Sequence, residues 1–478
     1  MNRPELDKIF ACQNAVIIAP AGHGKTEMIV DLVEASEGRQ LLLTHTNAGV
    51  DALKKRLDRR KIKNSKYSIY TIAAFCIRWG MSFNHTAKVD VNLSPYNSKT
   101  EAHRYYEQFY YGVKQIFLHD WAGMIIQASY AGVIVDEYQD CLQVHHEMFQ
   151  ELGRFLPVRV LGDPLQGIFS FRNQELVNWN NLGYQNIEID TFPWRWQNTN
   201  PDLGEYLNNV RTALWPTLSG QQCTLSIGAD NDNVCIIDPK AFNIFSMLRE
   251  LKQYKSVLYI TKWEAQQSAF CMKSSGVFQM DEKQECDELF KFARLFSHNT
   301  GNDLILDVID FESKCATKVN SELRSFIDKL KKNNYDFRRI TKNQSFGRMI
   351  EEVRNCNNNE AILRMLLWFE QNKAFKYYRL ELHREMVRSI KFAHDNNISV
   401  FEAAEHIRKD PALQIRYTDY KFIASRTLLS KGLEFDCVII DMETPLSAKE
   451  FYVAMTRAMK KIYIISSSAV LQFPSMLR

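Results

Sequence analysis

A short stretch near the N-terminus has the residue types of a loop that binds phosphate. It reads Ala19-Pro20-Ala21-Gly22-His23-Gly24-Lys25-Thr26. Glycines let backbone N–H groups turn toward phosphate oxygens, and the start of a following helix adds a favourable dipole for an anion. Lys25 would supply positive charge to the β and γ phosphates of a nucleotide, and Thr26 would place its hydroxyl on Mg²⁺. The alternative is a strand–turn–helix connection with an incidental Gly-Lys-Thr.

A pair of carboxylates ends an apolar run further along the chain. Val133-Ile134-Val135 is followed directly by Asp136 and Glu137. After a phosphate loop, such a pair suits nucleotide hydrolysis: Asp136 would hold Mg²⁺ through water, and Glu137 would orient and deprotonate the attacking water. The alternative is that the strand simply ends in acidic residues that face solvent. A phosphate loop earlier in the chain makes this alternative less favoured, because nucleotide hydrolysis requires both the loop and the acidic pair.

The elements that must position these residues alternate between strand and helix patterns. Apolar runs at 15–18, 41–44, 133–135 and 158–161 each end in a polar cluster, and most then enter a helical pattern. This is the rhythm of a doubly wound α/β sheet, which binds ligands beyond the carboxyl ends of its strands. The region from about 80 to 130 breaks the rhythm and predicts a small helical insertion. Strand patterns return at 187–189, 256–260, 422–424, 438–440 and 462–465, with a mostly helical pattern between about 271 and 412.

The length and composition of the chain limit the classes of protein to which it can belong. A chain of 478 residues with 45% hydrophobic and 24% charged residues is a globular protein of two or more domains. A net charge of only +4 does not by itself indicate a nucleic-acid binder. No apolar run reaches membrane-spanning length, and the N-terminus is too polar for a secretory signal. The ten cysteines are scattered, which predicts reduced thiols in the cytoplasm rather than disulfides or a zinc site.

Seven stretches in order resemble the motifs of superfamily 1 DNA helicases of the UvrD, Rep and PcrA type. The phosphate loop is the first, and 136–140 (DEYQD) is similar to motif II. The others are 44–48 with 71–75 (motif Ia and the segment after it), 162–172 (motif III), 193–195 (motif IV), 431–436 (motif V) and 452–458 (motif VI). The resemblance implies an α/β chain of two RecA-like P-loop NTPase domains with helical insertions. The first would span 1–185, the second 186–270 and 413–478, and the accessory helical insertion 271–412.

The resemblance also implies roles for single residues around the nucleotide. Gln166 would sense the γ-phosphate. Arg195 and Arg457, from the second lobe, would stabilise the charge of the transition state, since the guanidinium fork meets phosphate oxygens bidentately. Trp194 would stack on adenine, with a packing role in a core or an interface as its alternative. Glu434 would contact the nucleotide sugar or the coupling network.

On the nucleic-acid side, the resemblance places single-stranded DNA across both domains. His45, Asn47, Phe171 and Arg172 would line the track, with Phe171 stacking on bases or, alternatively, packing in the core. One position departs from the family pattern, because Leu428 stands where motif V usually carries a histidine. The compact size is similar to the helicase-like subunit of Gabija anti-phage systems, which implies a nuclease partner.

Three basic runs add charge that could contact DNA phosphates. They lie at 54–63, at 331–342 and at 373–388, the last two interleaved with aromatic residues. The alternative for each run is simply a solvated face of the protein.

Three functions remain open at this stage. The first is an ATP-driven motor on single-stranded DNA, moving 3′ to 5′ by resemblance and serving DNA repair or antiviral defence. The second is a DNA-end-sensing ATPase that regulates a nuclease complex without processive unwinding. The third, a P-loop kinase or metabolic ATPase, leaves Gln166, Arg195 and Arg457 unexplained.

Overall fold

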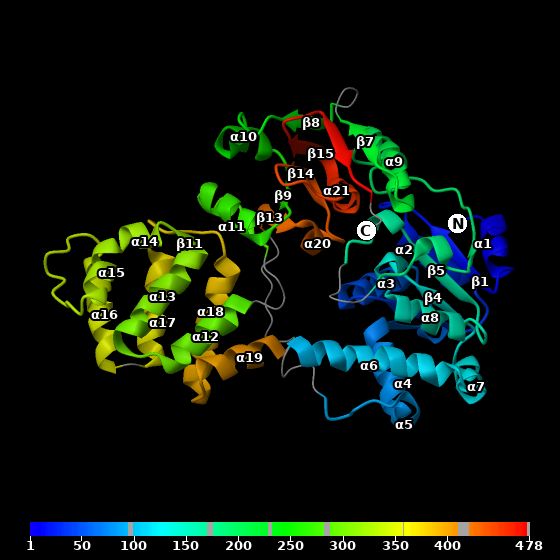
Figure 1. Cartoon of the computed structure of the whole chain (residues 1–478), viewed down its shortest axis with the longest axis horizontal. Helices are drawn as coiled ribbons and strands as arrows, with labels where there is room; N and C mark the ends of the chain where they lie inside the picture. The colour runs from blue at the N-terminus through cyan, green and yellow to red at the C-terminus, as the bar shows by residue number, and fades with distance from the viewer. Residues whose placement is uncertain are drawn as a thin grey trace. The chain divides into compact units, whose positions relative to one another are not determined.

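The protein folds into two compact units, which are described separately below. The structure is a computed structural model and describes residues 1–93, 99–169, 175–227, 232–281, 287–356, 358–409 and 420–475. Unit 1 comprises Met1–Asn233, Leu446–Lys460 and Ala469–Arg478, and unit 2 comprises Val234–Pro445 and Lys461–Ser468. Figure 1 labels the helices and strands of both units.

Unit 1 is built on a six-stranded parallel sheet. Its strands are β1 (Asn14–Ile18), β2 (Gln40–Thr44), β3 (Tyr67–Thr71), β4 (Gly132–Val135), β5 (Val158–Gly162) and β6 (Gln185–Asn186). Their order in the sheet is β3-β2-β4-β5-β1-β6. The strand before the phosphate loop and the strand before the acidic pair are therefore separated only by β5. All three end at the same edge of the sheet, where the residues that follow them meet.

Helices cover both faces of this sheet, and the side chains of β1 alternate between them. Ala15 and Ile17 pack in a core with helices α1 (Arg3–Phe10), α2 (Lys25–Ala35) and α3 (Asn47–Arg59). Val16 packs in the opposite core with α4 (Ile72–Ser82), α6 (Lys99–Phe117), α7 (Asp120–Ser129) and α8 (Gln143–Leu152). Figure 1 shows α6 running along α8, with α4 and the short α5 (Asn84–Ala87) beside it. Burial on both faces explains the continuous apolar runs of the strands.

Two further helices and a small two-stranded sheet also belong to unit 1. They are α9 (Pro201–Leu214), α21 (Ala448–Met455) and the antiparallel pair of β7 (Cys223–Ser226) with β16 (Val470–Phe473). Helix α21 contacts α9 and the short 3₁₀ helix η3 (Pro164–Gln166) that follows β5. Residues from three distant parts of the chain thus belong to one compact unit.

Unit 2 contains the second six-stranded sheet, of order β10-β13-β9-β14-β15-β8. Its strands are β8 (Val234–Ile237), β9 (Val257–Thr261), β10 (Gln279–Met280), β13 (Phe422–Arg426), β14 (Phe435–Asp441) and β15 (Ala458–Ile465). The central strand β9 pairs in parallel with both β13 and β14. Helices α10 (Ile244–Leu251), α11 (Glu264–Lys273) and α20 (Thr427–Ser430) connect these strands.

A separate helical part of unit 2 has its own hydrophobic core. Its main helices are α12 (Asp287–His298), α13 (Gly301–Cys315), α15 (Arg324–Lys331), α16 (Gln344–Cys356), α17 (Asn359–Gln371), α18 (Leu380–Asn396) and α19 (Val400–Lys409). The short α14 (Val319–Glu322) and the pair of β11 (Ala316–Thr317) with β12 (Lys376–Tyr377) lie among them. The core cluster draws only on residues between Leu289 and Ala404, which marks this region as a structural entity of its own.

The α/β architecture predicted from the sequence, with two parallel sheets and helical insertions, is confirmed. The domain boundaries at 185, 270 and 412 stay predictions. In the described part of the chain, no helix combines the length and the apolar character needed to cross a membrane.

Candidate nucleotide-binding site

The predicted phosphate loop connects β1 to the first residue of α2. Gly22 and Gly24 adopt left-handed backbone angles, with φ of +74° and +80°, which only glycine enters at little cost. Gly24 caps α2, and Lys25 is the first residue of the helix. The Lys25 ammonium is buried and donates hydrogen bonds to the carbonyl oxygens of Ala19 (3.1 Å) and Pro20 (3.4 Å). The loop therefore curls around its own lysine.

The segment after β6 lies directly on this loop. The backbone N–H of Arg195 donates to the carbonyl of Gly22 (3.1 Å). A methyl group placed on Gly22 would come within 2.6 Å of the Trp196 ring, and one on Gly24 within 3.2 Å of the Trp194 ring. Trp196 is buried, whereas Trp194 is 58% exposed. Trp194 thus stands at the mouth of the loop with much of its ring in solvent.

The acidic pair begins where β4 ends. The backbone N–H of Asp136 donates to the carbonyl of Leu43 on β2 (2.8 Å), and Glu137 adopts a left-handed φ of +52°. Burial and the neighbouring Glu137 carboxylate raise the pKa of Asp136 to about 7, although the Lys25 charge opposes this shift. Glu137 is half-buried and accepts a hydrogen bond from the Gln139 amide. The interaction of Asp136 with Lys25 brings the acidic pair and the phosphate loop into one site.

The predicted γ-phosphate sensor Gln166 lies in η3, beyond the end of β5. Its amide donates to the buried carboxylate of Asp163 (3.2 Å). The backbone N–H of Asp163 in turn donates to Gln139 (3.0 Å), which also contacts Glu137. Strand β5 is bonded to β1 at the loop itself, since the N–H of Ala19 donates to the carbonyl of Gly162 (3.1 Å). Gln166, Glu137 and the loop are therefore connected through a short chain of hydrogen bonds.

The two arginines that the resemblance assigns to the transition state both belong to unit 1. The Arg195 guanidinium donates to the carbonyl of Thr456 (2.8 Å). The Arg457 guanidinium is buried and donates to the carbonyl of Val453 (3.0 Å) and to the hydroxyl of Thr456 (3.1 Å). The resemblance had placed both arginines in the second lobe, whereas their contacts group them with the phosphate loop. Thr456 brings the two side chains to one place.

His23 occupies the interior of the loop and is almost fully buried. Its Nδ1 lies 2.9 Å from the carbonyl of Ala21, so the ring donates from this nitrogen. Burial, together with the positive charges of Lys25 and Arg211, lowers the pKa of His23 to about 4. The imidazole is therefore neutral at physiological pH and adds no charge to the loop.

The predicted site residues also include His45, Asn47, Glu434, Phe171 and Arg172. His45 is half-buried after β2, with Nε2 3.4 Å from the Sγ of Cys141, and Asn47 is exposed at the start of α3. Glu434 is exposed before β14 and belongs to unit 2. Phe171 and Arg172 lie outside the described residues. The DNA-binding roles of these residues stay predictions.

The first basic run is partly an ion-paired surface. Three of its arginines pair with acidic side chains of α2: Arg56 and Arg59 with Glu27, and Arg60 with Asp31 and Glu34. The lysines of the same helix, including Lys54 and Lys55, are exposed. The ion-paired arginines and the exposed lysines both fit a solvated surface, and a role of this run in DNA binding stays a prediction.

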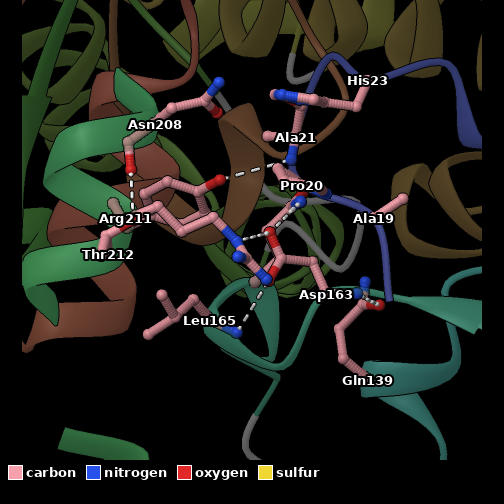
Figure 2. A network of polar contacts seen from close by, with 12 residues as sticks. Ala19, Pro20, Ala21, His23, Gln139, Asp163, Leu165, Asn208, Arg211 and Thr212 are labelled. Carbon is pink, nitrogen blue, oxygen red and sulfur yellow. Dashed lines mark hydrogen bonds and ion pairs between the residues drawn. The ribbon is translucent and has the colours of Figure 1, made fainter. Parts of the chain in front are cut away.

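Sequence reasoning missed three residues of the site. The Arg211 guanidinium of α9 pairs with Asp163 (3.2 Å), the Tyr452 hydroxyl accepts from the N–H of Ala21 (3.3 Å), and the Trp196 ring covers Gly22. Figure 2 shows Arg211 reaching Asp163 with Pro20 and Ala21 of the loop nearby. Neither Arg211 nor Trp196 lies in one of the seven motif-like stretches, whereas Tyr452 is the first residue of the stretch that resembles motif VI.

Comparisons with known proteins place part of this chain in a broad class. Residues 5–172 match a family model described as an AAA domain. No curated protein matches. Two solved structures with 10% and 11% sequence identity are similar over most of this chain. One is an arterivirus nonstructural protein 10 (helicase) in complex with DNA (97% of this chain, 63% of that chain, TM-score 0.36). The other is the Pif1 helicase from Candida albicans (98% of this chain, 95% of that chain, TM-score 0.35). This chain thus spans less than two thirds of the arterivirus protein.

Proposed function

We propose that this protein is an ATP-dependent DNA helicase or translocase of superfamily 1, moving 3′ to 5′ on single-stranded DNA. The observation that carries the proposal is the convergence of Lys25, Asp136, Glu137 and Gln166 at one edge of the sheet of unit 1. A basic group, a paired carboxylate and a polar sensor around a glycine loop are the groups that phosphoryl transfer requires. The match of residues 5–172 to an AAA domain agrees with nucleotide binding by this unit.

In the proposed mechanism, the loop and Lys25 receive the phosphates of ATP. The lysine now satisfies the carbonyls of Ala19 and Pro20, so it must exchange these bonds for phosphate oxygens. That exchange replaces neutral acceptors by charged ones, which form stronger hydrogen bonds. Neutral His23 keeps its bond to Ala21 and does not compete for the phosphate.

The acidic pair would serve the metal and the water. The hydroxyl of Thr26 and the carboxylate of Asp136 are the hard oxygen donors that Mg²⁺ prefers. The crowding of Asp136 and Glu137, which raises the pKa of Asp136, is relieved by a nearby cation, so these residues fit the metal. When bound, Mg²⁺ neutralises charge on the phosphates. Glu137 would accept the proton of the attacking water, and the Gln139 amide orients its carboxylate.

The residues around the loop would recognise the rest of the nucleotide. Trp194 presents an exposed ring beside Gly24 and would stack on adenine. Arg195 and Arg457 would turn from their carbonyl acceptors toward the charge that develops on the transferred phosphoryl group. Glu434 of unit 2 would contact the sugar. Single-stranded DNA would be held by His45 and Asn47, together with Phe171 and Arg172.

Steady-state ATP hydrolysis, with and without single-stranded DNA, tests this proposal. We expect DNA to stimulate turnover in the natural chain. Glu137→Gln should retain nucleotide binding and lose hydrolysis, because the water loses its base. Glu37→Gln, which makes the same chemical change in an exposed turn, is the matched control and should hydrolyse ATP normally. Normal turnover by Glu137→Gln would refute the assignment of the base.

A second candidate function is a DNA-end-sensing ATPase that regulates a nuclease partner in repair or antiviral defence. The observation that favours it is Leu428 in the motif V stretch, where the related helicases carry a histidine. Leu428 is the second residue of α20 and is 38% exposed. Because a leucine side chain has no hydrogen-bonding group, it offers DNA no polar contact. Strand separation by the chain alone on a tailed duplex would support the motor. Hydrolysis without separation would support the regulatory subunit.

A further inference from the structure

Asp163 is a carboxylate with no exposed surface at the end of β5, and several donors surround it. The Arg211 guanidinium contributes Nη2 at 3.2 Å and Nε at 3.4 Å. The Gln166 amide donates from 3.2 Å and the backbone N–H of Leu165 from 3.3 Å. A buried carboxylate stays ionised only when charge and hydrogen bonds compensate its lost hydration. Arg211 provides that charge.

The Arg211 side chain is held on two sides. One side faces Asp163, and on the other the guanidinium carbon lies 4.5 Å from the centre of the Trp215 ring. Its side chain is only 16% exposed. A planar guanidinium satisfies both contacts at once, whereas a lysine ammonium has neither the fork nor the flat face. The position therefore needs an arginine and not merely a positive charge.

Tyr452 extends this group of contacts to the phosphate loop. Its hydroxyl accepts a hydrogen bond from the N–H of Ala21 (3.3 Å). Burial, followed by the nearby Asp163 carboxylate, raises the pKa of Tyr452 well above its usual range. Asp163 thus bonds directly to Gln166 and lies near the tyrosine that holds the loop. Figure 2 shows Asp163 in this central position, with Arg211 directed toward it.

We propose that Arg211 is a positioning residue for nucleotide hydrolysis, which acts by fixing Asp163 and, through it, Gln166. The inference rests on the proposed function of the loop as a nucleotide site. Among the described residues, the Arg211 guanidinium contacts Asp163 and the Trp215 ring, neither of which is assigned to the reacting phosphate. Without the Arg211 guanidinium, the buried Asp163 carboxylate loses its charged hydrogen-bond partner, and Gln166 loses a defined orientation. Turnover then falls more than nucleotide affinity does.

The test separates kcat from the Kd for a fluorescent ADP analogue in Arg211→Gln and Arg211→Lys. We expect kcat to fall at least tenfold in both, while the Kd changes less than threefold. Arg154→Gln removes an arginine whose ion pairs with Asp120 and Glu151 lie at the surface, and it should leave both quantities unchanged. An unchanged kcat in Arg211→Gln would overturn the proposal, and so would equal losses in kcat and affinity.

Two further variants keep the proposal testable if Arg211→Gln folds poorly. Asp163→Asn combined with Arg211→Gln removes both charges together, so it should recover part of the lost kcat; a further loss would overturn the idea. Tyr452→Phe removes only the hydroxyl that bonds Ala21 and should weaken ADP binding about three- to tenfold, as expected for one hydrogen bond. This is the opposite pattern to that of Arg211→Gln, and the same pattern in both variants would overturn the separate role of Arg211. A natural chain that binds no ADP and hydrolyses no ATP would instead refute the proposed function.

Discussion

The packing of Trp196 on the phosphate loop makes Gly22→Ala a sharp test of the site. The new methyl group would lie 2.6 Å from one carbon of the Trp196 ring and 2.9 Å from the Cβ of Arg195. Contacts this short require a neighbour to move. Trp196 is 1% exposed, and its indole N–H donates to the carbonyl of Ala458 (2.7 Å), so the ring cannot turn away without losing that bond.

The magnitude follows from two costs. A left-handed backbone costs a residue with a side chain about 1 to 2 kcal/mol relative to glycine. Overpacking of a buried contact adds about 1 to 3 kcal/mol. Gly301→Ala isolates the first cost, because Gly301 has a φ of +58° and, among the described residues, no atom within 4 Å of the added methyl. The loss of free energy in Gly22→Ala should therefore exceed that in Gly301→Ala by about 1 to 3 kcal/mol, which is the contribution of the clash.

The assay is binding of a fluorescent ADP analogue, supported by urea unfolding of each variant. If the loop moves away from Trp196 while the fold survives, the clash appears as a loss of nucleotide affinity of about five- to 150-fold. Gly301→Ala should bind ADP as the natural chain does, at slightly lower stability. Trp196→Leu removes the clashing ring atoms, so the double variant should lose less than the sum of the two single variants. Equal ADP affinity and stability in Gly22→Ala and Gly301→Ala would refute the reasoning.

Three other predictions concern separate parts of the chain. Burial alone would lower the pKa of His383, but Glu312 and Glu370 raise it to about 9. The charge on His383 therefore stabilises the fold fully below pH 6.5, and this contribution is lost as the pH rises toward 9. In urea unfolding, the free energy of unfolding of the natural chain should fall by about 3 kcal/mol more than that of His383→Gln between these two pH values. Trp194→Ala should weaken ADP binding at least fivefold through lost stacking, whereas Trp263→Ala, which removes an equally exposed ring of unit 2, should not. Lys55→Ala should reduce the salt dependence of DNA binding, whereas removal of the ion-paired Arg60 should change it little; equal effects would contradict the division of the basic run.

Four of the six strands in the sheet of unit 1, β1, β2, β4 and β5, were predicted, because they are short and mostly buried. Such strands appear in the sequence as continuous apolar runs, and each ends at a polar cluster that the structure places at one edge. Strands β3 and β6, which are more exposed, were not predicted. The candidate phosphate loop and acidic pair could be proposed from the sequence because their chemistry depends on neighbouring residues. Local spacing therefore contains most of the information about these two features.

The rest of the site depends on contacts between distant residues. Asp163 and Arg211 are 48 positions apart, and Ala21 and Tyr452 are 431 apart. An arginine in an amphipathic helix has many possible partners, so its residue type alone indicates no particular one. The first basic run shows the same difficulty, since its arginines find acidic partners on α2 that no spacing within the run could indicate.

The contacts that assemble the site also suggest how it responds to nucleotide. Three of the bonds between the loop, the segment 194–196 and the segment 456–458 end on backbone carbonyls: those of Gly22, Thr456 and Ala458. Backbone acceptors remain when side chains change, so sequence patterns cannot reveal these bonds. Arg195 is held by two of these carbonyls, since its backbone N–H donates to Gly22 and its guanidinium to Thr456, so a movement of the loop around phosphate must also move Arg195. We therefore expect phosphate binding and the release of the Arg195 guanidinium to occur as one event rather than in sequence.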